Sequence, residues 1–104
     1  MTPPLEDKRA LVSALEERIL TGPGTAPPEL RANAFGNRDL AGPLAELVDK
    51  TARRSFQVTD HDFAAALAAG LSEDQLFELV ICAAVGESSR MYHAGLAMLA
   101  EASG

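Results

Sequence analysis

The sequence predicts an all-α fold, and two of its features support that prediction. Hydrophobic residues make up 47% of the 104 residues, but only four residues are Phe, one is Tyr and none is Trp. The apolar content therefore comes mostly from Ala and Leu, which favour close-packed helices over strands. Apolar residues also recur every three or four positions, the period of an amphipathic helix. We expect about five to six helices in a single domain spanning residues 1–104, because a second core would need a longer chain.

The first part of the chain predicts a long helix followed by a short one. Thr2 is a candidate N-cap, and the two prolines after it are tolerated in a first turn, so the helix is expected from about Pro3 to Leu20. Gly and Pro residues within 21–27 end this helix and give that segment the composition of a linker. A short helix is then expected over residues 28–35.

The middle of the chain predicts two further helices. A turn over residues 36–39 precedes an amphipathic helix, whose apolar face we expect to run from Leu44 to Phe56. Thr59 can cap the next helix, and Gly70 is expected to end that helix in the left-handed conformation.

The last third of the chain begins with a capping-box pattern. Ser72 is followed three residues later by Gln75, directly before an apolar run over residues 76–85. We expect Gly86 to break this run and a last helix to extend from about Ser88 to Glu101. One side of that helix carries Met91, Ala94, Gly95, Met98 and Leu99.

Charge and cysteine content exclude several classes of partner. Nine Lys and Arg against fifteen Asp and Glu give a net charge of −6, which would repel nucleic acid and anionic membranes. The single cysteine, Cys82, has apolar neighbours and is expected to be an inert core residue that forms no internal disulfide. No signal-peptide pattern is present, and the apolar runs are shorter than the ~20 residues that span a bilayer. We therefore expect a soluble, cytoplasmic protein.

The order of features in the second half of the chain resembles a known superfamily. A helix ends at Ala68-Ala69-Gly70 and is followed by Ser72, acidic residues, an Ala-rich apolar helix, a glycine and a final helix. This order is similar to that of the carboxymuconolactone decarboxylase-like, or alkylhydroperoxidase D-like, superfamily. The resemblance covers about residues 43–100 and leaves residues 1–35 as an N-terminal helical extension. It implies an alkylhydroperoxidase D-like helical bundle that assembles as a homotrimer or homohexamer.

The redox members of that superfamily carry a Cys-x-x-Cys-x-x-x-His motif whose histidine lies eight residues before the glycine. Counting back from Gly70 puts Ser55 and Val58 at the two cysteine positions and Asp62 at the histidine position. The same count puts Gln57 in place of a second histidine and Pro43 in place of a proton-relay glutamate. Disulfide exchange requires a thiolate. The resemblance therefore implies a branch without the Cys-x-x-Cys motif that is not a thiol peroxidase.

The decarboxylase members are similar in keeping a histidine at the position of Asp62. A one-residue slip would place His61 there, but it would also rotate the helix face by about 100°. Asp60, His61 and Asp62 combine an imidazole with two carboxylates, which suits acid–base catalysis by Asp62 or His61. Adjacent residues point around a helix, so the three cannot converge on one metal ion. We favour a capping and helix-dipole role for these residues over a catalytic one.

Three charged residues before this helix are further candidates. Glu46 could supply a catalytic carboxylate, although solvent exposure or an ion pair with Lys50 is favoured. Arg53 and Arg54 could orient an anionic ligand, but positive charges near a helix C-terminus also complement the dipole without any ligand, and we favour that interpretation.

Polar residues also gather at the start of the last helix. Glu87, Arg90, Tyr92 and His93 lie within seven residues, and Arg90 and His93 share a face. We favour a surface or subunit contact for this group over a catalytic role.

Two functions remain open from the sequence. The first is a non-redox, cofactor-free member of the superfamily that binds or converts a small organic acid or lactone, with Ser55, Val58, Arg53 and Arg54 as ligand-binding residues and no metal. The second is a non-catalytic, oligomeric helical module for protein interaction, in which an Ala/Gly-rich face at 94–97, with Met91 and Met98, contacts another subunit. A helical bundle unrelated to the superfamily is a third possibility.

Overall fold

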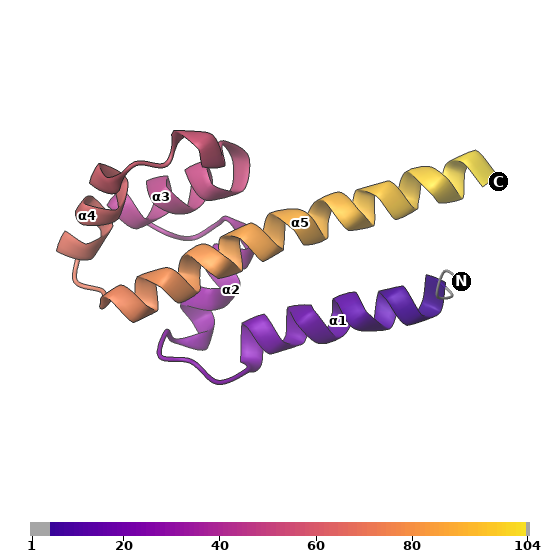
Figure 1. Ribbon diagram of the computed structural model, residues 1–104, viewed down its shortest axis with the longest axis horizontal. Helices are drawn as coiled ribbons and strands as arrows, with labels where there is room; N and C mark the ends of the chain where they lie inside the picture. Colours follow the sequence, from indigo (N-terminus) through magenta and orange to yellow (C-terminus); the bar gives the residue numbers. More distant parts are fainter. Residues whose placement is uncertain (1–4, 104) are drawn as a thin grey trace.

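Residues 5–103 fold into five α-helices and one 3-10 turn, which confirms the all-α prediction (Figure 1). The computed structural model describes residues 5–103. The elements are α1 (Leu5–Thr21), α2 (Pro28–Gly36), α3 (Gly42–Arg53), η1 (Ser55–Gln57), α4 (Asp60–Ala68) and α5 (Glu73–Ser103). The helix start expected at Thr2 and Pro3 lies outside the described residues.

Two long helices define the shape of the molecule, which measures 49 × 28 × 25 Å. Helices α1 and α5 lie side by side and antiparallel, so that the start of α1 and the end of α5 project together from one end (Figure 1). Helix α2 crosses the N-terminal half of α5, and α3 and α4 form the opposite end of the molecule (Figure 1). The result is a four-helix body from which the distal halves of α1 and α5 extend as a two-helix arm.

The hydrophobic core lies only in the body. Helix α3 and the first half of α5 contribute most of its fully buried side chains, among them Leu47, Leu76 and Leu79. Beyond Ser89, no described residue of α5 is buried. The arm therefore has no core of its own and leaves apolar side chains in contact with solvent.

Two of the predicted helix starts, at Thr59 and Ser72, are confirmed by hydrogen bonds. The Thr59 hydroxyl accepts a bond from the Asp62 amide, and the Asp62 carboxylate accepts one from the Thr59 amide. Ser72 and Gln75 form the same reciprocal pair at 3.0 and 3.1 Å. Gly70 has a φ of +114°, which favours glycine and lets the chain turn after α4.

Two expectations were wrong. Gly86 does not break the apolar run, because α5 continues through it as one helix of 31 residues. Its missing side chain instead lets α2 approach: a Cβ on Gly86 would overlap the carbonyl oxygen of Phe35. Phe56 does not extend the apolar face of α3, since it lies in η1 with 84% of its surface exposed.

Candidate functional site

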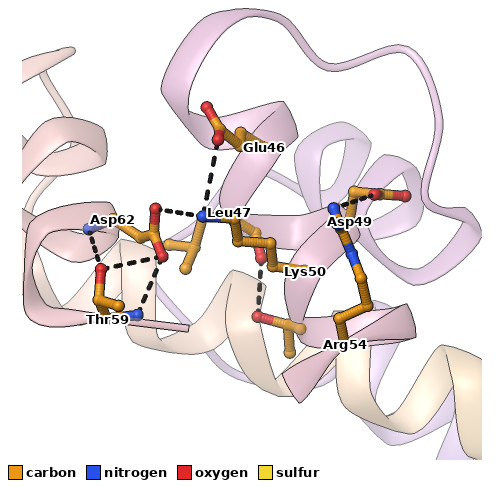
Figure 2. Close-up of polar contacts among 8 residues, drawn as sticks. Glu46, Leu47, Asp49, Lys50, Arg54, Thr59 and Asp62 are labelled. Atoms are coloured by element: carbon orange, nitrogen blue, oxygen red, sulfur yellow. Dashed lines mark hydrogen bonds and ion pairs between the residues drawn. The ribbon is translucent and has the colours of Figure 1, made fainter. Parts of the chain in front are cut away.

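Asp62 is the one sequence-predicted site residue that the fold buries, with 9% of its surface exposed. It lies in the first turn of α4 and points toward α3 (Figure 2). Its Oδ2 atom accepts hydrogen bonds from the Thr59 amide at 2.9 Å and the Thr59 hydroxyl at 3.1 Å. Its Oδ1 atom accepts one from Lys50 Nζ at 2.9 Å. Both carboxylate oxygens therefore have partners within the chain.

Lys50 connects this carboxylate to a second one. It lies on α3 with 19% of its side chain exposed, and its Nζ is 3.6 Å from Glu46 Oε1 (Figure 2). The expected pairing of Glu46 with Lys50 is thus confirmed, and Glu46 is otherwise exposed. The ammonium group lies between two carboxylates, of which Asp62 is the closer and the more buried.

The electrostatics of the pair favour the charged form of both partners. The hydrogen bond from Lys50, together with those from Thr59, lowers the pKa of Asp62 below its ordinary value. The hydrogen bond to Asp62 raises the pKa of Lys50, although desolvation opposes the shift. An ionised Asp62 with both oxygens engaged is a weak base and cannot act as a proton donor at neutral pH. Chemically, the arrangement is suited to linking α3 and α4.

The other residues counted from the superfamily motif do not gather around Asp62. His61 is exposed on α4, and Ser55 and Gln57 are exposed on η1. Val58 is partly buried and packs against the hydrophobic core. Pro43 lies exposed in the first turn of α3. None of these side chains lines the clefts that α1 forms with α5 and with the body of the molecule.

Arg53 and Arg54 are exposed, and both pair with the same carboxylate. Arg53 Nε is 3.2 Å from Asp49 Oδ1, and Arg54 Nη2 is 3.6 Å from Asp49 Oδ2. Asp49 also accepts a hydrogen bond from the Asn37 side chain at 2.9 Å, which links α3 to the end of α2. Sequence reasoning did not anticipate this cluster, although Asp49 and Arg53 have the i, i+4 spacing of a helical ion pair.

Two of the polar residues near the start of the expected last helix, Arg90 and His93, are exposed and contact neighbouring helices. Arg90 donates to the Phe35 carbonyl of α2 at 2.6 Å and to Glu87 at 3.0 Å. His93 Nε2 lies 3.3 Å from Glu16 Oε1 of α1.

A cleft of about 200 Å³ lies between the end of α1 and the body, next to Cys82. Arg31, buried in its wall, donates to the Gly22 carbonyl at 2.8 Å, whereas its Nε atom has no hydrogen-bond partner among residues 5–103. Glu78, also in the wall, accepts bonds from the Thr25 amide and hydroxyl and from the Ala26 amide. These side chains hold the connection between α1 and α2 in place.

The most apolar concave surface is the groove between α1 and α5. One section, of about 360 Å³, is lined by Leu15 and Glu16 of α1 and by residues of α5 that include Tyr92. Tyr92 also lines the next section, of about 600 Å³, which extends along the arm to Met98 and has Lys8 at its α1 side. The two sections form one groove along the arm.

The edge of this groove is a stripe on α5 that is apolar except for Ser88 and runs along most of the helix. Its residues are all exposed and alternate at spacings of four and three, the a and d positions of a heptad repeat. We refer to them as the α5 stripe: Phe77, Ile81, Ala84, Ser88, Met91, Gly95 and Met98. Only the last three of these belong to the face predicted from the sequence, because the break expected at Gly86 divides α5.

Among the described residues, no three His, Cys, Asp or Glu side chains lie close enough to hold a metal ion together. Within the same residues, no helix has the length and hydrophobicity to cross a membrane. Comparisons of the chain with protein-family models, with curated proteins and with solved structures found no match.

Proposed function

We propose that this chain is a self-associating helical module whose contact surface is the α5 stripe together with the neighbouring face of α1. One observation carries the proposal: α5 is apolar on two opposite sides. One side packs into the core through residues such as Leu79 and Cys82, and the other consists of the exposed stripe.

The exposed side chains are too large and too regular for an ordinary surface. Phe77 is 62% exposed, Met91 is 67% exposed and Met98 is 70% exposed, and all three lie on one face of α5. Leu11 and Leu15 of α1 are also exposed, at 69% and 49%. Monomeric proteins rarely expose contiguous apolar patches of more than a few hundred Å², and each Å² buried contributes about 25 cal/mol. A second helical surface over the arm would provide the core that it lacks.

The arrangement around Asp62 gives less support to the alternative of a small-acid or lactone enzyme. Asp62 is ionised and both of its oxygens accept hydrogen bonds, and His61, Ser55 and Arg53 do not share a cleft with it. The superfamily relationship stays part of the proposal at the level of scaffold. It is supported by the order of α3 and α4 and by the turn at Gly70, whereas the unbroken α5 departs from the expected glycine and separate final helix.

Light scattering during size-exclusion chromatography tests the proposal. We expect the purified chain to elute as an oligomer at micromolar concentration and Met91→Glu to shift it to the monomer, because the glutamate would have to be desolvated in the contact. Ala97→Glu is the matched control, since Ala97 is exposed on the same helix but lies off the stripe. A monomeric parent chain, or an oligomer that survives Met91→Glu but not Ala97→Glu, would overturn the proposal.

A further inference from the structure

We infer that two copies of the chain pair through their α5 helices in antiparallel orientation, with Ala84 of one copy opposite Gly95 of the other. This inference rests on the proposed self-association and adds the occupant, its direction and its register. It follows from the composition of the two flanks of the α5 stripe and from the spacing of its large and small residues.

The two flanks of the stripe differ in charge. On the α1 side, Val85, Tyr92 and Leu99 are uncharged and border the groove, and the one charged residue of this flank, Glu78, is bonded to the Thr25 and Ala26 amides. The other flank carries three glutamates, Glu73, Glu87 and Glu101, with Val80 and Ala94 between them.

This difference favours one relative direction of the helices. In a parallel pair, each charged flank packs against the α1-side flank of the other helix, which places glutamates over the apolar groove. In an antiparallel pair, like flanks meet, so the two grooves face one another. Leu11 and Leu15, exposed on α1, then lie beside the same residues of the second copy. Antiparallel pairing thus keeps the apolar surfaces together.

The register follows from the same residues. With Ala84 opposite Gly95, each a position of one helix lies opposite a d position of the other. Ser88 then lies opposite Met91, and Ile81 lies opposite Met98. All seven residues of the stripe are then covered. In the register shifted by one heptad, Met98 would oppose Asp74, and the two copies of Glu87 would lie near one another. Charge therefore disfavours this shift, and a shift of one heptad in the other direction would leave Phe77 and Ile81 outside the overlap of the two α5 helices.

The surface is large enough for a stable pair. From Phe77 to Ala102, the paired part of α5 is ~38 Å long at 1.5 Å per residue, and α1 adds a second helix alongside. Helix α1 is ~25 Å long, so two helices of about 10 Å diameter present roughly 600 Å² in projection. That is comparable with the ~800 Å² per partner of a standard interface.

Disulfide trapping tests direction and register together. In a Cys82→Ala background, one batch of protein carries Ala84→Cys and a second carries Gly95→Cys. Both sites are exposed, and a Cβ on Gly95 meets nothing within 4 Å. The two batches are mixed, allowed to exchange subunits and oxidised mildly. We expect a covalent dimer in the mixture and none in either batch alone, because identical sites would be ~16 Å apart along the axis, whereas a disulfide needs Cα atoms within ~7 Å. A mixture in which one batch carries Ala97→Cys is the control for random oxidation.

The other outcomes separate this inference from the function on which it rests. Covalent dimers in each batch alone would show a parallel pair and overturn the inference. If light scattering shows an oligomer but the mixture forms no disulfide, or if the oligomer is a trimer, the antiparallel pair is overturned and the proposed self-association remains. A homohexamer built from three such pairs is compatible with it. A monomeric parent chain would overturn both.

Discussion

Gly86 of α5 lies so close to Phe35 of α2 that a Cβ at position 86 would overlap the Phe35 carbonyl oxygen and stand 2.8 Å from its carbonyl carbon. The same oxygen accepts a hydrogen bond of 2.6 Å from Arg90, one turn further along α5. The end of α2 is therefore held against α5 by a close backbone contact and by a charged donor. This contact fixes the angle at which α2 crosses the longest helix.

We predict that Gly86→Ala destabilises the fold by at least about 1–3 kcal/mol, because the clash is with backbone that cannot rotate away. Gly95→Ala is the matched control, since a Cβ there meets nothing within 4 Å and alanine is the better helix former by up to about 1 kcal/mol. Both changes are made in the Met91→Glu background so that self-association does not contribute. Urea unfolding followed by circular dichroism measures the difference, and equal stability of the two variants would refute the close contact.

The sequence predicted what depends on neighbouring residues. The Thr59–Asp62 and Ser72–Gln75 caps were predictable because side chain and amide lie three residues apart, so local chemistry alone specifies the bonds. The Glu46–Lys50 pair was predictable for the same reason.

Contacts between helices were not predictable in this way. Lys50 and Asp62 lie twelve residues apart on different helices, and only the packing of α3 on α4 brings them to 2.9 Å. Gly86 was misread because a glycine in an isolated sequence looks like a helix breaker. Its function is visible only once Phe35 is placed next to it. Continuing the heptad spacing through Gly86 would have revealed the α5 stripe from sequence.

The Lys50–Asp62 pair predicts a specific dependence of stability on pH. The folded chain lowers the pKa of Asp62, so the stabilisation is present above the unfolded value of about 4 and is lost as pH falls through the lower folded value. We expect Asp62→Asn to reduce stability at neutral pH and to flatten the decline below about pH 4. Unfolding midpoints measured from pH 2 to 7 test this, with Asp60→Asn, an exposed neighbour in the same turn, as the control. An unchanged pH profile in Asp62→Asn would remove the pair from any role in stability.

Glu78 gives a third prediction, which concerns the connection between α1 and α2. Its carboxylate accepts bonds from the Thr25 amide at 2.8 Å and the Ala26 amide at 2.6 Å, which lower its pKa. Glu78→Gln leaves one neutral acceptor oxygen where the charged carboxylate had two. We expect faster proteolytic cleavage between residues 22 and 27, with the helices left intact. Mass spectrometry of limited digests locates the cuts, and Glu73→Gln, on the exposed first turn of α5, provides the comparison. Equal digestion of both variants would count against this role of Glu78.

The reactivity of the Cys82 thiol measures how readily the body of the molecule opens. Its side chain is 2% exposed, its Sγ atom is 3.9 Å from the Ile19 carbonyl oxygen of α1, and burial raises the pKa of the thiol. A thiol reagent can therefore react with Cys82 only after α1 or α5 has moved, because the thiolate is the reactive form and is disfavoured in the buried site. The control is an exposed cysteine introduced by Ala97→Cys in the Cys82→Ala background. We expect Cys82 in the native chain to be labelled at least a hundredfold more slowly than this control at pH 8. An opening free energy of about 2.7 kcal/mol is enough to slow labelling a hundredfold. Denaturant should abolish the difference. If Cys82 reacts as fast as the exposed control in the native chain, then the end of α1 does not cover it, and the contact between Cys82 and Ile19 is not a persistent part of the fold.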